Sequence, residues 1–377
     1  MSTKLASKLF QPFTLNDLTL PNRIVMAPMT RSKSPNGIAG PDVAEYYERR
    51  AKGGVGLIIT EGTFVDDAGS GSHWQPNVPR FYGQDALAGW QRVVDKVHAA
   101  GGLIFPQLWH LGISPTAGKN PDALNAVGPS GICTDGTTIN EPMSSKRIEQ
   151  AISAYGRSAG HAKTLGFDGL ELHGAHGYFL DQFIWSRTNK RTDKYGGATL
   201  GERARFVAEV VAEVRRQVGP EFPISLRISQ WKLGAYDFKN AANPEELEDW
   251  LTPLAAAGVD IFHCSNRRFW QPEFEGSNLN LAGWVKKLIG KPTITVGSVS
   301  LNEDFISTFG RAPHAEEDGD PKAITFHDLE DRLEHNEFDL VAVGRALISN
   351  PTWANLVRDN RSDALKPYDK EDLNELR

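Results

Sequence analysis

The sequence predicts an α/β fold, a single (β/α)8 TIM barrel that takes up all 377 residues as one domain. Three observations predict it: eight short apolar runs, a helical pattern after each run, and no large part of the chain left unassigned. The runs are continuously apolar rather than alternating, which is typical of parallel strands buried on both faces. A doubly wound parallel sheet is the main alternative.

The eight predicted strands are rich in Val, Ile, Leu and Phe. They cover residues 23–28, 55–60, 103–108, 167–172, 224–228, 259–264, 293–296 and 338–343. Ahead of them, residues 9–20 are expected to form a small hairpin that plugs the bottom of the barrel.

Helices are expected between these strands because apolar residues recur there at helical spacing. They cover residues 42–52, 86–99, 146–165, 201–218, 244–257, 281–289, 325–333 and 352–359. Gly166 is a suitable stop for the third helix. Asn243 and Pro244 are a suitable N-cap and first residue for the fifth.

Long excursions follow the third and sixth strands, at residues 111–145 and 266–280. Both leave the carboxyl ends of strands, which is the face where barrel active sites lie. A third insertion, at residues 311–322, is acidic and is expected to be a solvated surface segment. The charged tail from residue 359 onward is expected to cover the surface.

Composition excludes several classes of protein. Lys and Arg number 41 and Asp and Glu number 47, for a net charge of −6, which argues against a nucleic-acid partner. No apolar run is long enough for a membrane span, and the first residues lack the apolar stretch of a secretory signal. Cys133 and Cys264 are expected to be reduced thiols. We therefore expect a cytoplasmic protein without a membrane partner.

Polar residues end or follow at least six of the predicted strands. The most informative are Thr30, Arg31, Glu61, Thr63, Gln107, His110, His173, His176, Arg227, His263, Ser298 and Arg345. In a barrel these side chains converge on one mouth, and a purely structural protein has no need of such a cluster. The pattern predicts a binding or catalytic site.

Two loops resemble halves of a phosphate site. Gly297-Ser298 follows the seventh strand and Gly344-Arg345 follows the eighth, where barrels often bind phosphate through backbone N–H groups. The alternative is two glycines at helix entries and a surface arginine. No Gly-x-Gly-x-x-Gly motif follows the first strand, so a nicotinamide cofactor is not expected to bind in Rossmann fashion.

His173 and His176 are three residues apart at a predicted strand-to-helix turn, and both could face the mouth from the first helical turn. Three interpretations fit them: metal ligands, donors to a substrate carbonyl oxygen, or structural histidines. The first strand has no histidine, which weakens the metal interpretation because barrel metallohydrolases usually need a pair there. Tyr178 lies two residues beyond and could donate a proton or simply pack.

Several segments together resemble one known family. They are residues 27–31 (Ala-Pro-Met-Thr-Arg), 107–109 (Gln-Leu-Trp), 173–178 (His-Gly-Ala-His-Gly-Tyr), 181–183 (Asp-Gln-Phe) and 188–197, and the paired Gly-Ser and Gly-Arg loops. In this order they resemble the old yellow enzyme family of FMN-dependent ene-reductases, over roughly residues 8–360. The resemblance implies non-covalent FMN at the barrel mouth, NADPH or NADH as reductant, and no metal.

The resemblance also implies roles for individual residues. The isoalloxazine ring would contact Pro28, Met29, Thr30, Gly62, Gln107 and Arg227. The phosphate would lie against Gly297, Ser298, Gly344 and Arg345. The substrate pocket would be lined by His173, His176, Tyr178, Trp109 and Trp270, the first three of them catalytic.

The implied reaction is ping-pong reduction of an α,β-unsaturated carbonyl or nitro compound, a small-molecule partner. The two histidines would bind the substrate oxygen, and Tyr178 would protonate the α-carbon. A flavin dehydrogenase or demethylase on the same barrel is the alternative, and it does not need the proton donor. A metal-dependent hydrolase and a non-catalytic binding protein are further alternatives. The physiological alkene, the choice of nicotinamide and the oligomeric state, a homo-oligomer included, stay open.

Overall fold

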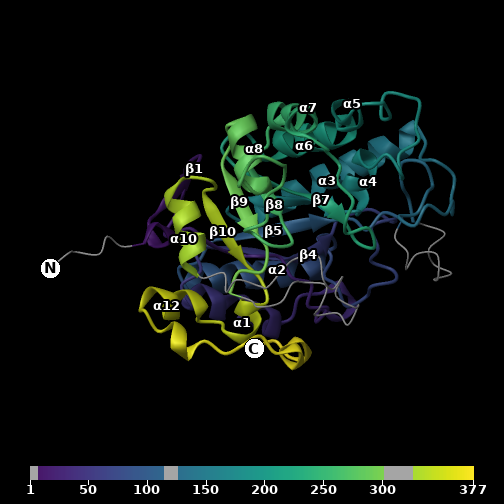
Figure 1. The fold of residues 1–377 in the computed structure, drawn as a ribbon. Helices are drawn as coiled ribbons and strands as arrows, with labels where there is room; N and C mark the ends of the chain where they lie inside the picture. The colour runs from purple at the N-terminus through teal and green to yellow at the C-terminus, as the bar shows by residue number, and fades with distance from the viewer. Residues whose placement is uncertain (1–6, 114–125, 301–325) are drawn as a thin grey trace.

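The computed structural model describes residues 7–113, 126–300 and 326–377. Eight parallel strands form a closed barrel in the order β10-β3-β4-β5-β6-β7-β8-β9, with helices around it (Figure 1). The strands are β3 Ile24–Met26, β4 Leu57–Phe64, β5 Ile104–Trp109, β6 Leu170–His176, β7 Ile224–Lys232, β8 Ile261–Ser265, β9 Thr293–Val296 and β10 Leu340–Val343. The predicted (β/α)8 barrel is confirmed, and the doubly wound alternative is wrong. The acidic segment 311–322 and part of the 111–145 excursion lie outside the described residues.

Three strands extend further than the apolar runs predicted. β4, β6 and β7 each continue about four residues past the apolar segment, into polar residues at their carboxyl ends. These residues still pair with neighbouring strands, but apolar periodicity does not mark them. The extra length carries the barrel's polar side chains toward the mouth.

The described helices follow the predicted order. They are α1 Pro41–Lys52, α2 Gln84–Ala99, α3 Ser145–Thr164, α5 Leu200–Arg203, α6 Arg205–Val218, α7 Pro244–Ala257, α8 Leu281–Ile289, α10 Phe326–Glu334 and α12 Trp353–Arg358. The helix expected over 201–218 is interrupted after Arg203, and its first turn is fixed by a capping box between Thr199 and Glu202. Asn243 caps α7 as expected, accepting from the Glu246 amide. Two short helices were not predicted, α4 Phe179–Ile184 and α11 Ala346–Ser349.

The predicted N-terminal hairpin is present as β1 Phe13–Leu15 and β2 Leu18–Leu20, paired antiparallel. Leu15 and Leu20 are buried in one apolar cluster with residues of the barrel interior, among them Ile59 and Phe105. The hairpin therefore closes the bottom of the barrel, where active sites are not found.

The C-terminal segment does more than cover the surface. After α12 the chain forms the short 3-10 helices η5 Ser362–Ala364 and η6 Lys370–Asn374, shown in yellow beside α1 in Figure 1. The Arg31 guanidinium donates to the carbonyl of Glu375 at 2.7 Å. This contact ties the tail to the first β/α unit at the barrel mouth. Among the described residues, no helix has the length and apolarity needed to cross a membrane.

Candidate active site

A cavity of about 340 Å³ opens at the carboxyl ends of the barrel strands, within the size range of small-molecule sites. The sequence-predicted cofactor residues on its wall are Pro28, Met29, Thr30, Gln107, Arg227, Gly297, Ser298, Gly344 and Arg345. His173, His176, Tyr178 and Trp109 line the same cavity. The fold therefore brings residues from eight separate segments of the chain to one space.

His173, His176 and Tyr178 form one corner of this cavity. The His173 ring centroid lies 5.2 Å from that of His176 and 4.9 Å from that of Tyr178. Both histidines lie in β6 and not on a helical turn as predicted. Residues three apart on a regular strand face opposite ways. His176 and the following Gly177 instead have left-handed φ angles of 64° and 81°, and both histidines line the cavity.

Burial determines the protonation of these three groups. It lowers the pKa of His173 to about 3, and the nearby Arg227 cation acts in the same direction. Burial likewise lowers the pKa of His176 far below its usual range. It raises the pKa of Tyr178 to about 12. At neutral pH the corner holds two neutral imidazoles and a protonated phenol.

His176 is held from two further sides. Its ring stacks on Trp231 with centroids 4.3 Å apart, and its Nε2 lies 2.8 Å from the Ser265 hydroxyl. The same hydroxyl accepts from Arg227 Nη2 at 3.3 Å. A hydroxyl that accepts from an arginine can direct its own proton to the histidine. This network favours the His176 tautomer with its N–H on Nδ1, assigned here from the hydrogen bonds.

A second polar layer lies beneath the cavity. Glu171 accepts hydrogen bonds from Gln107 Nε2 at 2.9 Å and Ser225 Oγ at 2.9 Å, and its Oε2 lies 2.8 Å from His263 Nδ1. Each of Glu171, Ser225 and His263 stands two residues before a cavity residue on its strand, so alternation puts all three one layer lower. The expectation that His263 reaches the mouth is wrong.

This layer orients Gln107. Burial opposes the charge of Glu171, but His263 and Arg227 outweigh it and hold the carboxyl pKa below its usual value. Burial lowers the pKa of His263, although its contact with the Glu171 carboxylate acts in the other direction. Because the Gln107 amide nitrogen donates to Glu171, its carbonyl oxygen is left to accept from a ligand in the cavity.

Glu61 supports the loop that carries Thr30. Its buried carboxylate accepts from the backbone amides of Arg31 at 2.8 Å and Ser32 at 3.2 Å. Burial raises the pKa of Glu61 to about 7, although both amide hydrogen bonds act the other way. The sequence marked Glu61 as a strand-end polar residue, but the structure places its side chain behind the cavity wall.

The cavity residues fit the implied FMN. His173 Nδ1 and Arg227 Nε are buried without a hydrogen-bond partner in the described part of the chain, which is costly unless a ligand supplies one. A Cβ at Gly344 would make only ordinary van der Waals contacts, with Met29 Sδ at 3.7 Å and Ala27 Cβ at 3.9 Å, so the protein itself leaves room there for a ligand. At Gly297 a Cβ would lie 2.8 Å from the Asn266 carbonyl, so that glycine is also required by the neighbouring loop.

Three predicted residues lie away from the cavity. Gly62 is behind Trp109, where a Cβ would come within 2.6 Å of the indole. Trp270 lies within the 266–280 excursion, where it packs edge-on against Phe269 at 5.1 Å and against the apolar core. His110 is buried and stacks on Phe179 at 4.0 Å. These positions support the wall of the site without lining it.

Sequence reasoning missed several cavity residues, among them Trp231, Leu233, Ser265, Tyr368 and Leu373. The first three directly follow or end strands, so their position after an apolar run was an available signal. Tyr368 and Leu373 come from the C-terminal segment, which carries no local sign of a site. Only the return of the chain to the first β/α unit reveals them.

Comparison with known proteins agrees with this geometry. Residues 8–313 match the model of the NADH:flavin oxidoreductase / NADH oxidase family. 12-oxophytodienoate reductase 7 of Oryza sativa subsp. japonica is 38% identical over 244 residues, covering 61% of this chain and 60% of that protein. NADH oxidase of Thermoanaerobacter brockii is 34% identical over 371 residues, covering 95% of this chain and 52% of that protein.

The chain thus spans about half to three fifths of the length of these two relatives. The solved old yellow enzyme homologue from Zymomonas mobilis superposes with a TM-score of 0.76 at 26% identity, covering 97% of this chain and 96% of the other. The family match extends over most of the barrel. The chain therefore belongs to the NADH:flavin oxidoreductase / NADH oxidase family, as its resemblance to the old yellow enzymes predicted.

Proposed function

We propose that this protein is an FMN-dependent ene-reductase that reduces the C=C bond of α,β-unsaturated carbonyl or nitro compounds. The observation that carries the proposal is the corner of two neutral imidazoles and a protonated phenol on one cavity wall. Bound FMN would carry a hydride from NADPH or NADH to the alkene β-carbon, with both reactants using one cavity in turn, a ping-pong scheme.

His173 and His176 bind the substrate oxygen. Two neutral N–H donors withdraw electron density from a carbonyl or nitro group and stabilise the negative charge that develops on its oxygen. Because burial keeps both imidazoles uncharged, each offers the substrate oxygen a hydrogen bond from a neutral N–H group. Ser265 and Trp231 fix the orientation of His176.

Tyr178 supplies the proton. Its raised pKa keeps the phenol protonated at neutral pH until the α-carbon acquires negative charge. The Trp109 ring meets the Tyr178 ring edge-on at 5.0 Å and limits its movement. A proton donor in this position is not needed for amine oxidation, so the flavin dehydrogenase or demethylase alternative leaves Tyr178 without a role.

Other cavity residues would hold the cofactor. Gln107 and Arg227 present an acceptor and a cation to the polar edge of the isoalloxazine ring, and Thr30 lies on the same wall. Gly297, Ser298, Gly344 and Arg345 would bind the phosphate. The described residues contain no group of three His, Cys, Asp or Glu that could hold a metal ion, so this geometry does not support a metal hydrolase. The two free cysteines, both buried, support our proposal of a reducing compartment such as the cytoplasm.

An anaerobic visible spectrum tests the proposal. The purified protein should show a flavin spectrum, bleach when NADPH is added, and regain its colour when 2-cyclohexenone follows. A protein that is colourless and cannot be reconstituted with FMN would overturn the cofactor assignment. A protein that bleaches but stays bleached with enone would overturn the ene-reductase assignment alone.

A further inference from the structure

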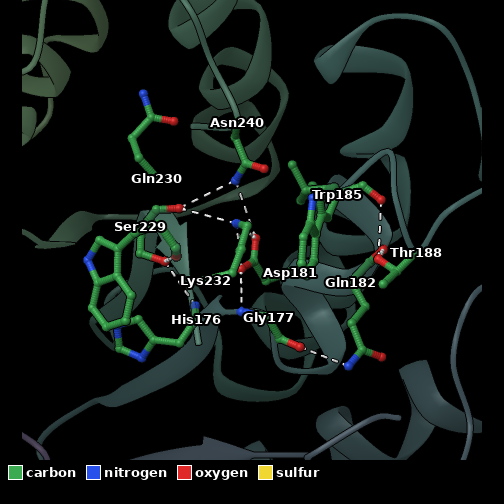
Figure 2. Close-up of polar contacts among 12 residues, drawn as sticks. His176, Gly177, Asp181, Gln182, Trp185, Thr188, Ser229, Gln230, Lys232 and Asn240 are labelled. Carbon is green, nitrogen blue, oxygen red and sulfur yellow. Dashed lines mark hydrogen bonds and ion pairs between the residues drawn. The ribbon is translucent and has the colours of Figure 1, made fainter. Parts of the chain in front are cut away.

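A fully buried ion pair lies directly behind the histidine and tyrosine corner. Lys232 Nζ is 2.6 Å and 2.7 Å from the two carboxylate oxygens of Asp181, and neither side chain is exposed to solvent. Lys232 ends β7 and pairs with His176, the last residue of β6. Asp181 belongs to α4, the short helix that begins just after Tyr178. Figure 2 shows the pair at the centre of a polar cluster.

Asp181 of this pair also binds the backbone of Gly177, the residue that links His176 to Tyr178. Asp181 Oδ2 accepts from the Gly177 amide at 2.7 Å, and the next residue, Gln182, donates from Nε2 to the Gly177 carbonyl at 2.8 Å (Figure 2). Consecutive side chains of α4 thus hold this residue from both ends. Glycine adopts its left-handed backbone readily, but His176 just before it is also left-handed and needs such support because L-residues disfavour this conformation.

β7 holds the other side of the same turn. Its register against β6 shifts between Gly174 and His176, and this irregularity brings Ser229 next to the turn. The Ser229 hydroxyl accepts from the His176 amide at 2.9 Å. The Ser229 backbone carbonyl accepts from Asn240 Nδ2 at 3.3 Å, and Asn240 Nδ2 also lies 3.4 Å from Asp181 Oδ1. Both residues before Tyr178 are therefore tied to one buried cluster.

Net stability is a poor explanation for this ion pair. Removing two charges from water costs about as much as their attraction returns, so apolar residues of similar size would stabilise the fold equally well. A charged pair does supply a directional acceptor that a methyl group cannot replace. Here that acceptor is used on the amide between the two groups that contact the substrate.

We propose that Lys232 and Asp181 are positioning residues, whose ion pair fixes the Gly177 peptide and thereby orients His176 and Tyr178 toward the substrate. The assignment to catalysis rests on the proposed function. The fixing of the turn does not, because it depends only on contacts within the protein.

Lys232→Met tests the proposal, and Lys286→Met is its matched control. Lys286 also pairs with an aspartate, Asp339, at 2.9 Å, but at the opposite end of the barrel. We expect amide hydrogen exchange of the peptide covering residues 173–180 to become about ten-fold faster or more in Lys232→Met and to stay unchanged in Lys286→Met.

Phenol binding to the FMN-loaded protein is the second measurement, because a phenolate oxygen mimics the substrate enolate between the two imidazoles. We expect the phenol Kd to rise about ten-fold in Lys232→Met, as for loss of one well-placed hydrogen bond, and to change less than about two-fold in the control. Unchanged exchange in Lys232→Met, or faster exchange with unchanged phenol affinity, would overturn the proposal.

The double variant Asp181→Leu with Lys232→Met covers the case in which a single variant fails to fold, because it leaves no unpaired buried charge and still removes the acceptor of the Gly177 amide. Its phenol Kd should also stay raised, and a wild-type value would overturn the positioning role. If the unsubstituted protein binds neither FMN nor phenol, the proposed function fails, while the exchange measurement still decides whether the ion pair fixes the turn.

Discussion

The two ends of the barrel are built in different ways. At the bottom, one contact is repeated before β6, β8 and β10: an aspartate just ahead of the strand pairs with the first residue of the preceding strand. Its amide donates to the carbonyl of that residue, and its carboxylate accepts from the amide of the same residue. The aspartates are Asp168, Asp260 and Asp339, and their partners are Ile104, Ile224 and Thr293.

Each bottom carboxylate also has a cationic or histidine partner. His98 lies 3.0 Å from Asp168, Arg215 pairs with Asp260, and Lys286 lies 2.9 Å from Asp339. The backbone N–H and C=O groups of these three strand starts are thereby hydrogen-bonded, and the hairpin leucines close the space between them. This end relies on one contact that is repeated with little variation.

Among the described residues the top shows no such repetition, and the strands that reach the cavity contribute different side chains to it. His173 Nδ1 and Arg227 Nε are buried there without partners in the described residues, and His176 has a left-handed backbone. The comparison shows that one barrel keeps a repeated stabilising contact at its bottom and a varied set of side chains around the cavity at its top.

Tyr178→Phe should impair catalysis at the top of the barrel without changing stability, and we expect it to have the largest effect. We expect the enone half-reaction to slow by about 10²- to 10⁴-fold, because the α-carbon loses its proton donor. Reduction of the flavin by NADPH should change little, and so should the urea midpoint, since the ring and its contacts with Trp109 and His173 are kept. Stopped-flow measurement of each half-reaction separates the two. Equal slowing of both would remove Tyr178 from the role of proton donor.

Asp260→Ala should lower the stability contributed by the bottom of the barrel without changing the cavity. The substitution leaves the Ile224 amide without its side-chain acceptor and Arg215 without its partner, so the free energy of unfolding should fall by about 3 kcal/mol. FMN affinity, measured by flavin fluorescence, should stay the same because no cavity residue touches Asp260. A large loss of FMN affinity at unchanged stability would contradict the separation of the two ends.

Glu61 is a buried carboxylate at the top that can be compared with the three aspartates at the bottom. It accepts from two backbone amides but lacks an ion pair among the described residues. Its pKa rises from an ordinary 4.5 to about 7 on folding. Between these values the folded state binds more protons than the unfolded state, so stability is fullest below about pH 4.5 and falls as pH rises through about 7.

Glu61→Gln should remove this dependence. We expect the wild-type protein to lose about 2 kcal/mol more than the variant between about pH 5.5 and pH 7.5, from 1.36 kcal/mol per pKa unit. Urea unfolding at both pH values gives the difference, and the histidines that titrate in this range are common to both proteins. Parallel pH profiles would show that Glu61 is ionised throughout, and would contradict its raised pKa.

Much of the fold was predictable because its signals are local. Eight apolar runs identified eight strands, and Asn243-Pro244 identified the start of α7, because periodicity and capping act over a few neighbouring residues. The polar ends of β4, β6 and β7 and the short helix α4 were missed. These elements are stabilised by tertiary contacts, including the Asp181–Lys232 pair, and not by local sequence preference.

The candidate site was predictable to a similar depth. Residue type and strand-end position brought Gln107, His173 and Arg227 to the cavity, but could not tell that His263 lies one layer below. That distinction depends on which face of the strand each side chain points to and on the register between neighbouring strands. Both change wherever a β-bulge or another irregularity interrupts the pairing. Tyr368 and Leu373 could not be found at all without the path of the C-terminal segment.

The sequence by itself determined the barrel, the face that carries the site and the residue types available there, because each of these follows from short-range patterns along the chain. The tertiary structure alone decided which of those residues meet. It set the left-handed turn at His176 and Gly177, the Glu171 layer beneath the cavity and the ion pair behind it. The physical reason is that burial and long-range hydrogen bonds fix a side chain's direction and its pKa, and both depend on residues far away in the sequence.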